Sequence, residues 1–255
     1  MKKNKYSISP NLPKGKVVQA AISSQAPITI TALKACGISC LKIPPWPALA
    51  APVQSHADML CHPLGGKKVL VARENKHLFS SFQKNGFQPF FTQNFLQKEY
   101  PGDILLNAVQ MGALCFASPF CDGTLKEALK RENIRLVCVK QGYAKCSTVV
   151  VSQEACITAD PSIANSAKKE GLEVLQIRSG FVELPGYPYG FLGGACGKLA
   201  NDTLAFSGDL RTHPDADAIC SFLANHHVIP FSLHGGPLLD IGGILPLREE
   251  EEEEN

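Results

Sequence analysis

The sequence lacks the features that assign a chain to a membrane or nucleic-acid class. No apolar run approaches the roughly 20 residues that a membrane span requires, and the basic first residues are not followed by the apolar segment of a signal peptide. The net charge is only +2, and no basic stripe stands out. Long-range attraction to nucleic acid or to an anionic membrane is therefore not indicated. We expect a cytoplasmic protein with neither as a partner.

Paired cysteine motifs are also absent, although cysteine is abundant. The chain has ten cysteines and no CxxC pair, which argues against zinc-ribbon and thioredoxin-like sites. Several, such as Cys138 and Cys156, lie in apolar runs typical of strands. Without an export signal, buried and reduced thiols are expected rather than disulfides.

What the sequence does contain is one pattern that occurs five times. Each copy is a short amphipathic segment, then a turn residue, then an apolar run. The turn residues are Gly37, Gly86, Asn133, Gly171 and His227, spaced 38 to 56 residues apart. A period of this size is typical of arrays and propeller-like rings built from one supersecondary unit.

The pattern predicts a helix before each turn and a buried strand after it. The second helix has Asn75 as a candidate N-cap, and the fourth has Asp160 as N-cap with Pro161 at its first position. In the third, Thr124 and Glu127 have the spacing of a capping box.

Each unit continues with a loop, a second segment and a third apolar strand, but the fifth unit has no third strand. The missing strand is found at residues 17–23 (VVQAAIS). We predict that this N-terminal strand completes the last unit, so that the ring leaves no sheet edge exposed.

The predicted fold is an α/β class protein, a closed five-bladed α/β propeller of ββαβ-type repeats around a pseudo-five-fold axis. A three-layer α/β sandwich is the alternative. One domain is predicted over residues 16–247, with an N-terminal extension over 1–15 and a disordered acidic tail over 248–255.

Two segments carry a resemblance to a known family: ELPGYPYGFLGG (183–194) and GPLLDIGG (236–243). Over nearly its whole length the chain resembles an uncharacterised bacterial family with the pentein fold of the guanidino-modifying enzymes (GME). That superfamily includes arginine and agmatine deiminases, dimethylargininase and amidinotransferases. The resemblance implies a five-bladed fold and no established activity.

The chain departs from the catalytic members of that superfamily at two places. Those enzymes carry a cysteine nucleophile in unit five and a histidine with a carboxylate in unit four. Here the corresponding segments read DIGGI (240–244) and YGFLGG (189–194), and no cysteine follows Cys220. Glycine has no nucleophile and phenylalanine carries no transferable proton, so we expect the reaction of the superfamily to be absent.

The second segment of each unit is expected to face the ring axis, where a rigid scaffold presents its functional residues. The ligand-binding candidates in these segments are His56, Asp58, Asp103, Asn107, Lys145 and Asp240. Carboxylates suit a planar guanidinium because they hold it by paired hydrogen bonds. Each candidate also has a structural interpretation as a loop cap or a turn residue.

Two further residues are candidates for catalysis. Cys146 follows Lys145, a neighbour that lowers the pKa of a thiol, and His234 could pair with Asp240 across the axis. Unit one also offers metal-ligand residue types within residues 56–62, but we expect no metal and no cofactor.

The expected function is binding of a small cationic or amino-acid-like ligand in the axial cavity, without catalysis or with a divergent reaction. Two alternatives stay open. One is a guanidino-modifying hydrolase or transferase with a displaced cysteine nucleophile. The other is a structural or interaction protein whose axis is filled by apolar side chains.

Overall fold

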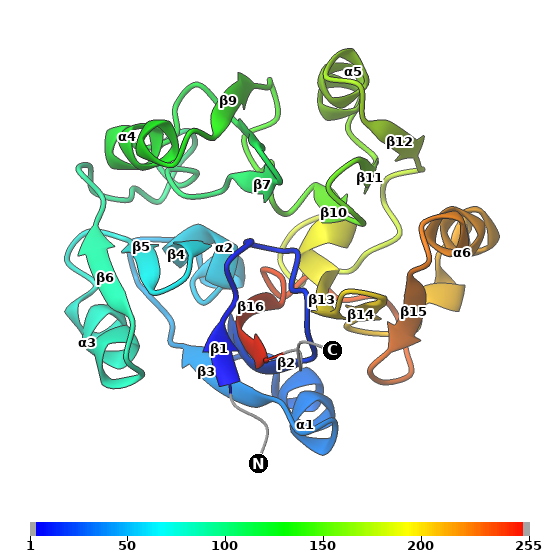
Figure 1. The fold of residues 1–255 in the computed structure, drawn as a ribbon, viewed down its shortest axis with the longest axis horizontal. Coiled ribbons are helices and arrows are strands. Elements are labelled where there is room, and N and C mark those ends of the chain that lie inside the picture. Colours follow the sequence, from blue (N-terminus) through cyan, green and yellow to red (C-terminus); the bar gives the residue numbers. More distant parts are fainter. Residues whose placement is uncertain (1–3, 252–255) are drawn as a thin grey trace.

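The computed structural model describes residues 4–251, which form a mixed α/β fold of five small sheets arranged around a common centre (Figure 1). Four sheets have three strands and one has four, and within the described residues no sheet closes on itself. One helix lies on the outer side of each sheet (Figure 1). The loops at the inner ends of the strands therefore face one another near the centre.

Four of the sheets repeat one order of elements: two antiparallel strands, a helix, and a third strand parallel to the middle one. The elements are β4 (Cys61–Gly65), β5 (Lys68–Val71), α3 (Lys76–Lys84) and β6 (Gln88–Phe91); β7 (Val109–Met111), β8 (Leu114–Ala117), α4 (Gly123–Arg131) and β9 (Arg135–Cys138); β10 (Thr148–Val150), β11 (Ala155–Thr158), α5 (Pro161–Lys169) and β12 (Glu173–Gln176); and β13 (Cys196–Ala200), β14 (Thr203–Phe206), α6 (Ala216–Asn225) and β15 (Ile229–Ser232).

The two ends of the chain meet in the remaining sheet. Its strands are β1 (Asn4–Tyr6), β16 (Leu245–Glu250), β2 (Val17–Ser23) and β3 (Ser39–Ile43), with α1 (Pro27–Ala35) before β3. β2 runs antiparallel to β16, with Ala21 opposite Leu245, and parallel to β3. The predicted pairing of residues 17–23 with the end of the chain is thus confirmed at the level of strand register.

Both terminal segments contribute strands outside the predicted domain of residues 16–247. Residues 4–6 form a strand, and β16 continues to Glu250 where a disordered tail was expected. The reason is the burial of Glu249, whose carboxylate accepts hydrogen bonds from Ser7 Oγ at 3.2 Å and from the backbone N–H of Lys14 at 2.9 Å. The rest of the predicted tail, residues 252–255, lies outside the described residues.

All five predicted turn residues have a positive φ, as the repeat pattern requires. The values are 82° for Gly37, 80° for Gly86, 56° for Asn133, 83° for Gly171 and 55° for His227. These backbone conformations end the helix and turn the chain into the next strand. They confirm the five copies of the pattern.

The helix caps follow the sequence in two cases and depart from it in one. Asn75 and Asp160 accept backbone N–H bonds at the starts of α3 and α5, as predicted. The capping box over residues 124–127 is wrong: Asp122 caps α4 by accepting from the backbone N–H of Thr124. The helix begins at Gly123, so Thr124 lies inside its first turn and Asp122 has the N-cap position.

The cysteines are all free. Cys156 is buried as predicted, but Cys138 is exposed, because it ends β9, a strand at the edge of its sheet. An apolar run therefore does not guarantee burial of its last residue.

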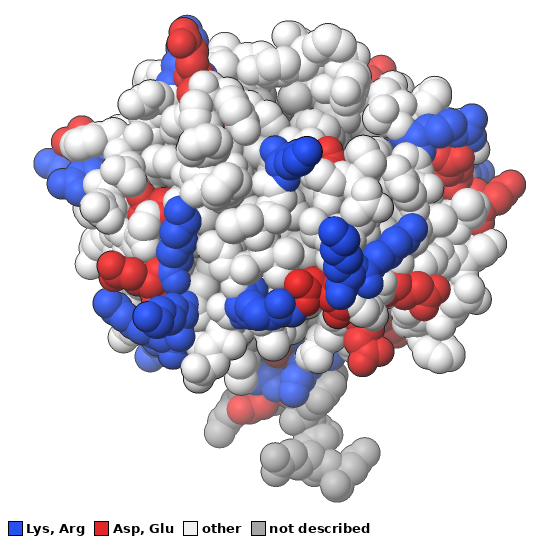
Figure 2. Space-filling view, turned by 90° about the horizontal axis from the view of Figure 1, so that it is seen from above, with Lys and Arg blue, Asp and Glu red and all other residues white. Residues whose placement is uncertain are grey.

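The outer surface carries mixed charge. On the face shown in Figure 2, lysine and arginine are interspersed with aspartate and glutamate, and no broad region of one sign forms. Among the described residues, no helix combines the length and the apolar character that crossing a membrane demands.

The tight packing near the centre predicts a difference between two glycines. A Cβ on Gly197, in β13, would lie 2.0 Å from the carbonyl oxygen of Ile244, whereas a Cβ on Gly235 would meet no heavy atom within 4 Å. We expect Gly197→Ala to lower the free energy of unfolding by about 1–3 kcal/mol, and Gly235→Ala to change it by less than about 0.5 kcal/mol. Urea denaturation measures both, and equal midpoints would contradict this packing.

Candidate functional site

A cavity of about 250 Å³ lies where the inner loops of several units meet. It is lined by Val53, His56, Met59, Tyr143, Cys146, Leu184, Tyr187, Pro188, Tyr189, Phe191 and Asp240. The lining comes from units one, three, four and five of the sequence pattern. The centre is therefore not filled by apolar side chains, which counts against the filled-axis alternative.

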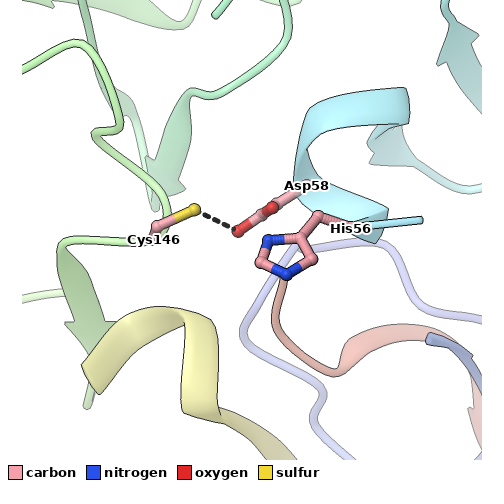
Figure 3. Close-up of side chains that lie close together, drawn as sticks. All are labelled: His56, Asp58 and Cys146. Atoms are coloured by element: carbon pink, nitrogen blue, oxygen red, sulfur yellow. Dashed lines mark hydrogen bonds between the residues drawn. The ribbon is translucent and has the colours of Figure 1, made fainter. Parts of the chain in front are cut away.

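Cys146 lies at the floor of this cavity and is held by two side chains. Its Sγ donates a hydrogen bond to Oδ2 of Asp58 at 3.0 Å (Figure 3) and accepts one from Nδ2 of Asn107 at 3.1 Å. Oδ1 of Asn107 accepts the backbone N–H groups of Lys145 and Cys146, at 2.8 and 3.3 Å. Asn107 thus fixes both the loop and the thiol, a role that the sequence did not specify.

The thiol of Cys146 is held in its protonated form. Burial raises its pKa well above the ordinary value, and the nearby carboxylates of Asp58 and Asp240 raise it further. The sequence suggested the opposite, because Lys145 is adjacent. The structure corrects this, since the ammonium of Lys145 donates to the carbonyl oxygen of Gly193 at 3.2 Å.

Asp240 enters the cavity from the segment before β16 and is fixed by backbone donors. Its Oδ2 accepts the N–H of Phe191 at 2.9 Å and its Oδ1 the N–H of Gly242 at 3.0 Å. A Cβ on Gly194 would lie 2.0 Å from Oδ1, so this position requires glycine. Burial raises the pKa of Asp240, and the carboxylate of Asp58 adds to the rise.

His56 immediately precedes the short helix α2 (Ala57–Leu60), whose first turn also carries Asp58. Its Nδ1 lies 3.8 Å from Oδ1 of Asp240. Nδ1 of His56 and Oδ1 of Asp58 are buried and make no hydrogen bond within the described part of the chain. Such unpaired groups each cost about 1–3 kcal/mol, which marks this corner of the cavity as a place suited to a polar ligand.

Asp103 acts on the cavity indirectly. Its Oδ2 accepts a hydrogen bond from the hydroxyl of Tyr143 at 2.7 Å, and Tyr143 lines the cavity. Burial raises the pKa of Asp103. Asp103 therefore orients an aromatic wall and does not itself line the cavity.

His234 lies apart from the cavity. Its Nε2 is 3.1 Å from Oγ1 of Thr29 and its Nδ1 is 2.9 Å from the carbonyl oxygen of Gly235. The expected His234–Asp240 pair is therefore corrected: the histidine next to Asp240 is His56, from the other end of the chain.

A second, much smaller cavity lies on the other side of Asp58. His62, Cys61 and Lys145 line it together with Asp58. Burial lowers the pKa of His62 to about 4. The sequence grouped His56 and His62, but the structure assigns them to different cavities.

Sequence reasoning missed the aromatic wall of the larger cavity. Tyr143, Tyr187, Tyr189 and Phe191 all contribute to it, and the rings of Tyr143 and Phe191 stack with centroids 6.1 Å apart. The signal available was the density of aromatic residues in 187–191 (YPYGF).

Comparisons with known proteins assign the chain to a family. A family model described as "Family of unknown function (DUF6873)" matches residues 21–245. No curated protein matches the chain.

Solved structures match it over most of its length at low identity. DDAH from Pseudomonas aeruginosa, complexed with citrulline, is 11% identical with a TM-score of 0.54, covering 86% of this chain and 93% of that one. Agmatine deiminase from C. jejuni is 9% identical with a TM-score of 0.52, covering 91% and 92%. An inosamine-phosphate amidinotransferase from Streptomyces griseus is 9% identical with a TM-score of 0.56, covering 99% of both chains. The chain therefore has the pentein fold of the guanidino-modifying enzymes, as the sequence suggested.

The buried imidazole of His62 predicts a pH dependence of stability. Between pH 6.5, the ordinary pKa of histidine, and about 4, the pKa of His62 in the fold, the unfolded chain binds a proton that the folded chain does not. Stability therefore falls as the pH falls through this window.

We expect this one group to remove about 2 kcal/mol from the free energy of unfolding between pH 7 and pH 5. Urea denaturation at the two pH values should show the loss, and His62→Gln should reduce it by that amount. His77→Gln, at an exposed position, is the matched control and should leave it unchanged. An equal pH dependence in wild type and His62→Gln would contradict a neutral buried His62.

Proposed function

We propose that this chain, which belongs to the DUF6873 family of unknown function, binds a small cationic guanidino or amino-acid-like ligand in its central cavity without transforming it. The observation that carries the proposal is a pair of buried carboxylates at a largely apolar and aromatic cavity: Asp240 lines the cavity, and Asp58 is bonded to Cys146, which also lines it.

The charges at the floor favour a cation. Two carboxylates stand against one ammonium, that of Lys145, which is engaged by the carbonyl oxygen of Gly193. Because burial raises the pKa of Asp240, a cation beside it stabilises its charged form. Both carboxylates keep acceptor positions for the N–H groups of a guanidinium or an ammonium.

The wall of the cavity supports the same class of ligand. Tyr143, Tyr187, Tyr189 and Phe191 line it, and aromatic faces attract cations most strongly where water is excluded. The volume of about 250 Å³ lies just below the 300–1,000 Å³ typical of pockets for drug-sized ligands. A compound of the size of arginine or agmatine suits it.

The names of the structural relatives point to the same chemistry. One was solved with citrulline, and others are an agmatine deiminase and an amidinotransferase. The segment 240–244, which corresponds to the nucleophile position of such enzymes, contains no cysteine. The cysteine that lines the cavity, Cys146, has a raised pKa and donates its thiol proton to Asp58 in a hydrogen bond. Both facts support binding without catalysis.

A second function is favoured by one observation. Cys146 and His56 line the same cavity, and their ligand atoms lie within 4.8 Å of each other. This arrangement supports a hydrolase or transferase in which Cys146 attacks the guanidinium carbon after losing its proton to His56.

Two broader expectations belong to this proposal. The five sheets would form a closed five-bladed propeller, supported by the β16–β2 pairing of the chain ends. The free cysteines support a reducing compartment such as the cytoplasm.

Ligand binding is tested by thermal shift with arginine and agmatine in the presence of a chelator. A ligand at one hundred times its Kd stabilises the native state by about 2.7 kcal/mol, which raises the Tm of a chain of this size by roughly 5–10 °C. Asp240→Asn and Asp58→Ala should abolish the shift, because each removes one anionic partner of the cation.

The matched control is Asp217→Asn, which removes an exposed carboxylate far from the cavity in α6. It should keep the full shift. If no guanidine or amino acid shifts the wild-type Tm, the proposed function is wrong.

Catalysis is tested by release of ammonia or of a ureido product from the same compounds. We expect no release above the level of Cys146→Ser. Turnover by the wild type that disappears in Cys146→Ser would replace the binding function with the second one.

A further inference from the structure

Three side chains of different chemical type converge beside the central cavity, and two of them, His56 and Cys146, line it. His56 and Asp58 flank the start of α2, and Cys146 comes from the loop before β10 (Figure 3). One ligand atom of each, an imidazole nitrogen, a carboxylate oxygen and a sulfur, lies within 4.8 Å of the other two. His56 and Cys146 are 90 positions apart in the chain, so tertiary structure alone brings the three together.

The three side chains are buried, and two of them have unsatisfied atoms. His56, Asp58 and Cys146 have exposed fractions of 4%, 2% and 3%. Within the described residues, Nδ1 of His56 and Oδ1 of Asp58 have no hydrogen-bond partner. A buried acceptor without a partner is costly, and a bound cation satisfies such atoms.

We propose that His56, Asp58 and Cys146 form a zinc site at the floor of the central cavity. Nitrogen, sulfur and carboxylate oxygen are the three ligand types of Zn²⁺ in proteins, at about 2.0–2.3 Å from the ion. Calcium and magnesium prefer oxygen ligands alone. To share one ion, the three ligand atoms, which lie within 4.8 Å of one another, move closer together.

The surroundings complete such a site. Nδ2 of Asn107 donates to Sγ of Cys146 at 3.1 Å, a bond that a zinc-bound thiolate retains. Oδ1 of Asp240 lies 3.8 Å from Nδ1 of His56, so a second carboxyl group lies next to the proposed ion.

The charges balance at the ion. Without metal, the thiol of Cys146 donates its proton in a hydrogen bond to Asp58. When Zn²⁺ binds, the S–H bond breaks, the Zn–S bond forms, and the proton is released to water. The carboxylate of Asp58 and the thiolate together offset the two positive charges. Metal binding therefore releases a proton and weakens as the pH falls.

The fourth position of the ion faces the cavity, because His56 and Cys146 both line it. Three protein ligands and one open position are typical of zinc sites that bind water or a small molecule, whereas structural zinc sites have four protein ligands. This site departs from the expectation of no metal. Its ligands also differ from the metal-ligand residue types that the sequence offers within residues 56–62. Cys61 is not a ligand, because its thiol donates to the carbonyl oxygen of Ala57 at 3.2 Å.

The test is cobalt and zinc titration of the full chain after dialysis against a chelator. Wild type should bind one equivalent of Co²⁺ with a thiolate-to-cobalt charge-transfer band in the near ultraviolet, and one equivalent of Zn²⁺ should displace it. Cys146→Ser should lose the band, while His56→Gln and Asp58→Asn should weaken zinc binding by at least about 100-fold, more than a lost outer partner costs.

Cys61→Ala is the matched control, because Cys61 is the cysteine nearest in sequence to His56 and Asp58 and is not one of the proposed ligands. This variant should keep both the cobalt band and the zinc affinity. Urea midpoints of all variants show whether each is folded. A wild type that binds no cobalt, or a band that persists in Cys146→Ser or vanishes in Cys61→Ala with the fold intact, overturns the proposal. The titration of the wild type tests the zinc site even if a variant fails to fold. The thermal shift with arginine and agmatine is measured in the presence of a chelator, so its outcome is independent of the zinc result.

Discussion

Direct packing of backbone against backbone at the centre is the constraint on which the site depends. The N–H of Gly194 donates to the carbonyl oxygen of Cys146 at 2.9 Å, and its own carbonyl oxygen accepts the N–H groups of Ile241 and Gly243 at 3.0 and 2.7 Å. A side chain at residue 194 would collide with the carboxylate of Asp240. Glycine here therefore joins units three, four and five closely enough for Cys146 and Asp240 to share one cavity.

Burial then decides the chemistry of the groups that this packing brings together. Two carboxylates and a thiol occupy a region that excludes water, so the pKa of Asp240 and that of Cys146 both rise. A nucleophilic cysteine requires the reverse, a positive environment that favours the thiolate. A cation at the floor reverses the balance, whether it is a guanidinium or a metal ion, because it stabilises the charged forms of the same groups.

The pentein scaffold accounts for why polar groups from distant parts of the chain meet at one centre. Loops from different units meet at the centre of any such fold, and each unit can supply polar groups independently of the others. In this chain the cysteine comes from unit three and its closest partners from units one and two: Asp58 and Asn107. The cysteine at this centre thus comes from a different unit than the family resemblance of the sequence leads one to expect.

The repeat and much of the fold follow from the sequence alone. Turn residues with positive φ, the caps Asn75 and Asp160, and the N-terminal strand that pairs with the chain's end are local or periodic features, and they are readable because backbone conformation depends on nearby residues. It also named most of the polar residues at the centre. Which of these residues meet depends on the folding of distant segments together: His56 and not His234 lies beside Asp240, Asp58 and not Lys145 is bonded to the thiol of Cys146, and Asp122 and not Thr124 caps its helix. Such pairings depend on distances between segments far apart in the chain, or on small offsets in register. Neither can be predicted from the spacing of residues along the sequence.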